Sequence, residues 1–245
     1  PSSRIVNRKR KSSRIQLSRR LAADVKYVFE MSLIVLINKI FGKRFINRFN
    51  ITNRCFFSFY PQMFRKPYVD DRYRGFVADD DTYLVTLVAD GMHQQVSPIQ
   101  YIRLLRSIPR KKYLVVDVHL KFLDIIVGMA WWFRMYRALL MKNDSTYFYG
   151  GLNVTNYIRQ EITWSISRVA RLMVFSGGLE RVVKQLKSDE LIYIVFEHPL
   201  GRLISHIVGI CRPDILRTGF NHGDYSWRFI NYFLAQHKKE QEKGN

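Results

Sequence analysis

The chain has 245 residues, of which 47% are apolar and 14% aromatic, and its 40 Lys and Arg against 20 Asp and Glu give a formal net charge of +20. This composition excludes wholesale disorder, and the length suits one domain with an appendage or two small domains. The two cysteines are too few for a disulfide framework or a CxxC metal site, and they fit a reducing compartment. So large an excess of positive charge makes a polyanion (RNA, DNA or an anionic membrane) the first partner to consider.

The positive charge is concentrated at the N-terminal end of the chain. Residues 1–66 carry a net +14, whereas the remaining residues carry +6, and residues 1–23 contain eight basic residues, five serines and no acid. Two interpretations fit this composition: an arm that binds RNA, which we favour, and a residual organellar targeting sequence. The predicted phosphate contacts in the arm are Arg8, Lys9, Arg10, Lys11, Arg14, Arg19 and Arg20.

A helix is predicted over residues 21–41, where apolar residues recur at steps of three and four. The most apolar runs, 31–37 and 125–133, are far shorter than the ~20 residues that a transmembrane helix needs, so we expect no membrane insertion. The alternative for residues 21–41 is a basic amphipathic helix lying on a membrane surface.

Residues 45–60 are aromatic, basic and irregular in pattern. One interpretation is an RNA surface on which bases stack on Phe56 and Phe57 while arginines pair with phosphates. The other is a loop that packs over the body through its phenylalanines. Further predicted RNA contacts in and beside this segment are Arg44, Arg48 and Arg54.

From residue 75 onward, strand and helix patterns alternate. The expected strands are 75–78, 112–117, 146–149, 191–196 and 214–218. The expected helices run from Thr82 (with Asp81 as N-cap and a break near Pro98) to 107, over 120–136, from 154, and over 179–186, 203–210 and 225–236. This alternation predicts an α/β fold, with a Rossmann-like or flavodoxin-like parallel sheet and helices on both faces. The cluster Arg110, Lys111 and Lys112 before one strand is a further candidate RNA contact.

The chain contains no coherent catalytic set. GxGxxG, GxxxxGK[ST], GxSxG and HExxH are all absent, and Asp79–Asp81 is interpreted as a structural cap. We therefore expect no enzyme activity, no cofactor, no metal and no small-molecule substrate. The alternative hypothesis is a Rossmann-like ligand-binding domain or enzyme with a targeting segment, and its nucleotide or metal would bind at the strand ends near Asp117, His119, Glu197 and His198.

The segment YFYGGLNVTN (residues 147–156) resembles the RWLGGxLTN signature of the ribosomal protein S2 family. Other segments follow in the family's order: YPQM, PYV and RGFVAD resemble NPKM…PYI…RNGIHIID, KYLVVD resembles the KVLFVGTK strand, and LIYIVF with the following proline resembles ALFVVDPxKE. Residues 210–216 resemble GIPVIAI, and NHGD before the last helix resembles GNDDAI. The resemblance covers residues 58–238. It lacks the family's GTK, and the 34 residues between Asn156 and Leu191 are too few for the long coiled-coil hairpin of bacterial members.

This resemblance implies a diverged mitochondrial member of the family, located in the matrix. Such a protein is a structural constituent of the small ribosomal subunit on its solvent side, near the mRNA exit, where it binds ribosomal RNA and neighbouring ribosomal proteins. The expected organisation is a basic extension with one helix (1–57) and an S2-like α/β domain (58–245). In the signature, Gly150 and Gly151 allow positive φ angles, and Thr155 or Asn156 can bond backbone at the start of the helix.

Overall fold

The computed structural model describes residues 21–42, 52–66, 69–70, 72–73, 75–88, 96–108, 112–141, 146–194 and 199–220. The strands are β1 (Thr52–Phe59), β2 (Phe64–Lys66), β3 (Val69–Asp70), β4 (Thr82–Thr86), β5 (Tyr113–Val115), β6 (Phe148–Tyr149), β7 (Leu152–Asn153), β8 (Ser188–Ile194) and β9 (Leu216–Phe220). The helices are residues 21–37, continued by the π-helical η1 (Asn38–Gly42), then α3 (Pro98–Ser107), the 3-10 helix η2 (Val116–His119), α4 (Phe122–Met141), α5 (Thr155–Gln185) and α6 (Pro199–Cys211).

The core of the protein is a five-stranded, all-parallel sheet in the order β5-β4-β1-β8-β9. The predicted parallel α/β fold is thereby confirmed. Numbered along the chain, the order is 3-2-1-4-5, which matches the first five strands of the Rossmann arrangement rather than the flavodoxin order 2-1-3-4-5. The point where the strand order reverses lies between β1 and β8.

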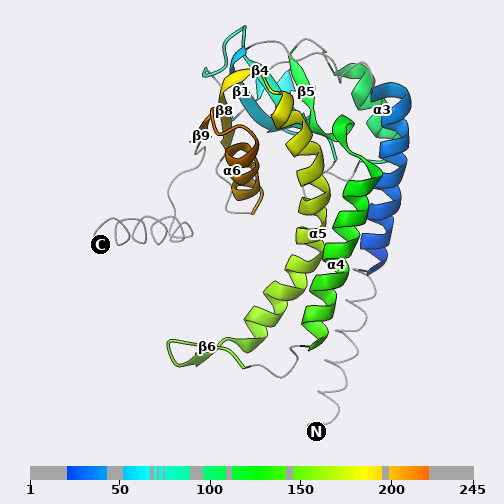
Figure 1. Ribbon diagram of the computed structural model, residues 1–245, viewed down its shortest axis with the longest axis vertical. Coiled ribbons are helices and arrows are strands. Elements are labelled where there is room, and N and C mark those ends of the chain that lie inside the picture. Colours follow the sequence, from blue (N-terminus) through cyan, green and yellow to red (C-terminus); the bar gives the residue numbers. More distant parts are fainter. Residues whose placement is uncertain are drawn as a thin grey trace.

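Both faces of the sheet are covered by apolar side chains. On one face, Phe56 of β1 lies in register with Tyr83 of β4, and their rings contact aromatic residues of the connection that follows β1. The ring of Tyr73 is centred 5.0 Å from that of Phe56, and the ring of Phe64 is 5.1 Å from that of Tyr83. On the other face, the ring of Phe57 is centred 6.2 Å from a ring of α5, so this helix covers that side (Figure 1).

The irregular segment predicted over residues 45–60 is wrong where the structure describes it, because residues 52–59 form β1, the central strand. A domain boundary at residue 57 would therefore divide this strand. Phe56 and Phe57 are fully buried, so they pack inside the protein as one interpretation expected, but they cannot stack on RNA bases. The strand escaped prediction because it is buried on both faces and lacks the alternation of a half-buried strand.

The predicted helix starting at Thr82 is also wrong, since residues 82–86 (TYLVT) form the fully buried strand β4. Asp81 is not a helix cap: it accepts hydrogen bonds from Arg54 Nε (3.2 Å) and Nη2 (2.8 Å) and from the amide of Ala78 (2.6 Å). Residues 75–78, expected as a strand, form a turn. The helix begins only at Pro98, where Ser97 and Gln100 form a capping box.

The three long helices, residues 21–37, α4 and α5, run side by side away from the sheet, and β6 lies at their far end (Figure 1). We call them the stalk.

The helix expected over 120–136 is confirmed by α4, whereas the two expected from 154 and over 179–186 form one 31-residue helix, α5. Residues 157–190, all of which the structure describes, contain the rest of α5 and the start of β8 and no helical hairpin. Three other expected elements are confirmed as β8, α6 and β9, and helix 225–236 lies outside the described residues.

Glycines let α4 and α5 approach closely. A Cβ atom at Gly128 would lie 2.9 Å from the carbonyl oxygen of Ala170, and one at Gly177 would collide with Oδ1 of Asp124. The carboxylate of Asp124 is fixed there by Arg181, whose Nη2 lies 2.6 Å from Oδ1 and whose Nη1 lies 2.7 Å from Oδ2. Gly177 and the neighbouring Gly178 lie inside α5, where they allow close helix packing and do not end the helix.

Replacing Gly128 by Ala should lower the free energy of unfolding by about 1–3 kcal/mol, because the new methyl group meets backbone that cannot move aside. The matched control is Gly209→Ala in α6, where the new methyl group meets only the guanidinium of Arg217, whose long side chain can move. Here higher helix propensity should leave stability equal or raise it by up to about 1 kcal/mol. Chemical denaturation of both variants measures this, and equal losses would contradict the packing role of Gly128.

Candidate functional site: an apolar groove in the stalk

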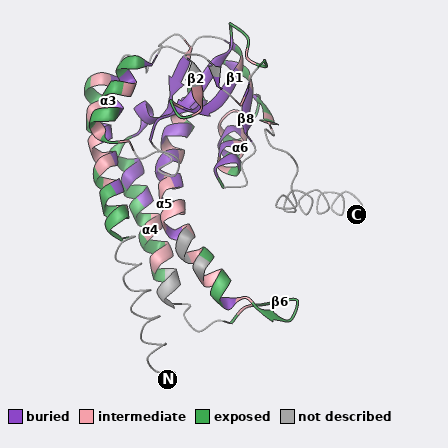
Figure 2. Cartoon of the chain, turned by 180° about the vertical axis from the view of Figure 1, so that it is seen from behind, coloured by how far each residue is buried: buried purple, intermediate pink, exposed green. Residues whose placement is uncertain are grey.

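The outer side of the stalk exposes large apolar side chains. On residues 21–37 they recur at steps of four, four and seven, and on α4 they recur at steps of three and four, so each set forms one helix face. Their exposed fractions range from 37% to 64%. We call these residues the apolar face; Figure 2 shows in green the exposed residues of the stalk helices, polar and apolar alike. The apolar face comprises Leu21, Val25, Phe29 and Leu36 of the first helix and Phe122, Ile126, Met129 and Phe133 of α4.

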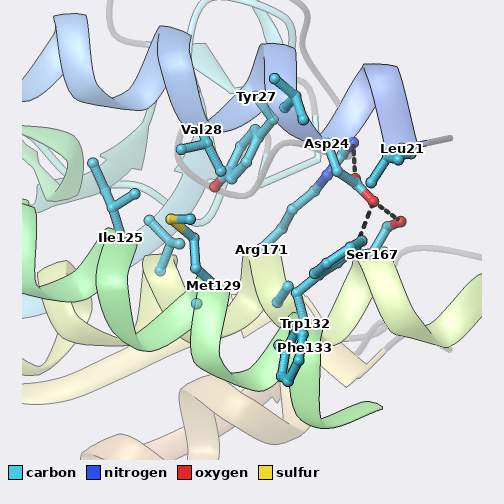
Figure 3. Close-up of a pocket in the computed structure, with 14 residues that line it drawn as sticks. Leu21, Asp24, Tyr27, Val28, Ile125, Met129, Trp132, Phe133, Ser167 and Arg171 are labelled. Atoms are coloured by element: carbon cyan, nitrogen blue, oxygen red, sulfur yellow. Dashed lines mark hydrogen bonds and ion pairs between the residues drawn. The ribbon is translucent and has the colours of Figure 1, made fainter. Parts of the chain in front are cut away.

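A groove of about 290 Å³ opens between the first helix and α4, and α5 closes it from below (Figure 3). Val25 and Met129 of the apolar face line its opposite walls, and Ala170 and Val174 of α5 lie among its lining residues. Gly128 also lies among the lining residues, at the point where α4 meets α5. Exposed apolar side chains that gather on one face, rather than being scattered singly, mark interaction surfaces. This face is therefore the strongest candidate for a functional surface.

One end of the groove is polar and ties the three helices together. Asp24 accepts hydrogen bonds from Trp132 Nε1 (3.0 Å), Ser167 Oγ (2.6 Å) and Arg171 Nη2 (3.1 Å), which come from α4 and α5. The guanidinium of Arg171 also lies 4.9 Å from the ring centre of Tyr27. The carboxylate of Asp24 is thus fully occupied by structural contacts, as Figure 3 shows.

Asp117 lies at the carboxyl edge of the sheet, where open α/β folds bind ligands. It is completely buried and accepts hydrogen bonds from the amides of Leu87 (2.6 Å) and Val88 (3.0 Å), so it fixes the chain after β4. His119 is 8% exposed, and burial, with a further contribution from Arg181, lowers its pKa to about 4. Glu197 and His198, the other residues of the alternative enzyme site, lie outside the described residues.

The polar groups near the strand-order reversal point bond to one another. Ser58 of β1 donates to Asp70, and Arg72 contacts both carboxylate oxygens of Asp70 (3.0 and 2.7 Å) and Ser58 Oγ (2.6 Å). All three side chains are at least nine-tenths buried. Sequence reasoning missed this network, because nothing in the local pattern links a serine in a strand to residues 12 and 14 positions later. Across the described ranges, no group of three or more His, Cys, Asp or Glu could hold a metal ion.

Most of the predicted RNA contacts lie outside the described residues: Arg8, Lys9, Arg10, Lys11, Arg14, Arg19, Arg20, Arg44, Arg48, Arg110 and Lys111. The two that the structure describes have acidic partners within the chain. Arg54, whose side chain is 35% exposed, pairs with Asp81, and Lys112 Nζ lies 3.7 Å from Oδ1 of Asp79. The charge of Arg54 is therefore compensated internally, and RNA binding at all of these positions stays a prediction.

The GG signature forms the hairpin β6–β7 at the tip of the stalk, separate from the main sheet. Gly150 (φ 55°) and Gly151 (φ 80°) make the two-residue turn, which confirms the predicted positive φ angles. Thr155 Oγ1 accepts a hydrogen bond from the amide of Tyr147 (2.8 Å), as expected for backbone bonding at the helix start. Asn153, which sequence reasoning missed, caps the amide of Thr155 (3.0 Å), while Asn156 is exposed.

Comparisons with protein-family models, with curated proteins and with solved structures find no match to this chain. Within the described ranges, no helix combines the length and apolar character that crossing a membrane requires.

His119 should make stability depend on pH. The folded protein keeps this imidazole neutral down to about pH 4, whereas the unfolded chain takes up a proton below about pH 6.5. Protonation therefore favours the unfolded chain in this window, and the free energy of unfolding should fall by on the order of 3 kcal/mol as the pH drops from 6.5 to 4.

The variant His119→Gln tests this dependence. As the pH drops from 6.5 to 4, the free energy of unfolding of the wild type should fall by more than that of the variant. Urea denaturation at several pH values measures both. His206→Gln, at an exposed position of α6, is the control. A difference that stays constant from pH 7 to pH 4 would contradict the role of His119.

Proposed function

We propose that this chain is a structural constituent of the mitochondrial small ribosomal subunit, where it binds ribosomal RNA and neighbouring ribosomal proteins. The observation that carries the assembly part of this proposal is the apolar face, because neighbouring exposed apolar side chains of this kind mark interaction surfaces. The formal charge of +20 supports an RNA partner. The ribosomal and mitochondrial parts rest on the resemblance of residues 58–238 to the S2 family.

The proposed mechanism is electrostatic and architectural. Lysine and arginine side chains of the arm neutralise phosphates, release counterions and fix the position of the protein without reading base sequence. The arm suits this role because residues 1–23 contain eight basic residues and no acid, so their charge has no compensating partner nearby in the sequence. The paired arginines of the folded body contribute less.

The ligand-binding alternative receives less support from the geometry. At the carboxyl edge of the sheet, Asp117 accepts hydrogen bonds from two backbone amides, and Ser58, Asp70 and Arg72 bond to one another. A nucleotide or substrate site needs polar groups that point toward an open space. The groove in the stalk, by contrast, is open and has an apolar lining.

The deciding experiment is sedimentation of organelle lysate in low and high salt, with this protein followed by mass spectrometry. We expect stable comigration with the small subunit that is lost only after RNase treatment or at very high salt. If the protein stays at the top of the gradient as a free species, the proposed function is wrong.

Deleting residues 1–20 should weaken incorporation into the subunit while leaving the body folded, because the deletion removes eight positive charges but no described element. For RNA binding by the purified chain, log K should fall with log[salt] with a slope that is about 7 units steeper in the full chain than in the deletion variant, at about 0.9 per phosphate contact. The variant Arg202→Gln, at an exposed position of α6 that is not a predicted RNA contact, should leave the slope almost unchanged. Equal slopes for the full and shortened chains would contradict the role of the arm.

A further inference from the structure

We propose that the groove in the stalk is the docking site for an amphipathic α-helix with acidic flanks, supplied by a partner protein. The inference goes beyond the proposed function, because such a helix can occupy the groove whether or not the chain belongs to a ribosome. It rests on the shape of the groove, on the arrangement of its apolar walls and on the charge around it.

The shape of the apolar face fits a helix. From Leu21 to Leu36 the face spans 15 helical steps, or about 22 Å, which matches four turns of a partner helix. The groove occupies one end of this face, where residues 21–28 of the first helix and residues 125–133 of α4 form its two walls, with a trough between them (Figure 3). A ridge of side chains on a further helix fits such a trough in the same way as helices pack within proteins. A docked helix would convert the three-helix stalk into a four-helix arrangement.

The charge around the face selects an acidic partner. Lys39 lies 5.3 Å from the ring centre of Phe122, and Arg137 follows Phe133 by one helical turn. Over residues 21–42, α3 and residues 121–137, seven basic residues are exposed and no acidic residue is. These exposed residues are Lys26, Lys39, Arg103, Arg106, Lys121, Arg134 and Arg137. Opposite charges on a partner speed association and disfavour other occupants.

Two other occupants fit these observations less well. A membrane surface is fluid and broadly flat, whereas the groove is concave and one end of its lining carries the carboxylate of Asp24 together with Ser167 and Arg171. A ridge of side chains on a helix fits this trough, whereas a flat bilayer surface does not. A second copy of this chain would bring another formal charge of +20 against the basic border of the face.

The test uses the full chain and a fluorescein-labelled 18-residue peptide that carries leucines at helical spacing and glutamates elsewhere. Fluorescence anisotropy measures its binding, and a scrambled peptide of the same composition shows how much binding comes from charge alone. We expect the patterned peptide to bind at least tenfold more tightly than the scrambled one, because only the patterned peptide can place its leucines in the groove.

Matched variants locate the binding surface. The double variant Val25→Glu, Met129→Glu changes two exposed groove residues and should weaken patterned-peptide binding more than tenfold. The control Ile210→Glu, Leu216→Glu makes the same chemical change at two similarly exposed apolar positions on α6 and β9, and should change binding less than twofold. Circular dichroism establishes that both variants are folded, and Leu21→Glu, at a groove position 46% exposed, provides a second groove variant should the double variant be unfolded.

Four outcomes would overturn the proposal. The first is equal binding of the two peptides, and the second is equal weakening by the groove and control variants. The third is flotation with phosphatidylserine vesicles that the groove variant abolishes while the patterned peptide fails to compete, which would identify a membrane as the occupant. The fourth is a dimer of the free chain, seen by analytical ultracentrifugation, that the groove variant dissociates. None of these results depends on ribosome sedimentation, so the two proposals can fail separately.

Discussion

The burial of β1 between two apolar layers is the constraint on which the rest of the structure depends. Phe57 on one face of this central strand contacts Phe175, which positions α5 under the sheet. The helix α5 in turn positions α4, because Gly128 permits close contact between the two helices and the pair Asp124–Arg181 locks it. Asp24 then draws the first helix onto both of them. The groove is the space that this sequence of contacts leaves open.

Two helices of the stalk are apolar on their exposed sides as well as on their buried sides. Each helix buries the side that faces its two neighbours, yet the first helix and α4 carry apolar residues on their outer sides as well. A helix that is apolar on more than one side belongs inside a larger assembly, where a second surface covers it. The stalk therefore has the composition of a part whose core is completed by another molecule.

Buried aspartates hold the fold together. Among the residues that the structure describes, five aspartates are buried or half-buried, and each is bonded to arginine, to a backbone amide or to both. These residues are Asp24, Asp70, Asp81, Asp117 and Asp124. Over the whole chain, the 40 Lys and Arg outnumber the 20 Asp and Glu twofold, which leaves an excess of positive charge that is concentrated toward the N-terminal end. Different charged residues therefore serve the two purposes: the buried aspartates stabilise the fold, and the excess lysines and arginines attract a polyanion.

The sequence by itself determined the class of fold and several local features. Alternating apolar runs and helical patterns predicted a parallel α/β sheet, and the pair Gly150–Gly151 predicted a turn with positive φ angles, because glycine is the residue that adopts them without strain. Strands buried on both faces lack the alternation of apolar and polar residues, so the sequence pattern does not predict β1 and β4 as strands. Their pairing in the sheet establishes them. The groove could not be predicted from the sequence either. Its polar end joins Asp24 to Arg171, 147 positions apart, and no local pattern encodes which helix faces meet across such a separation. Local propensity and period are properties of short segments, whereas the candidate site is a property of how three helices pack.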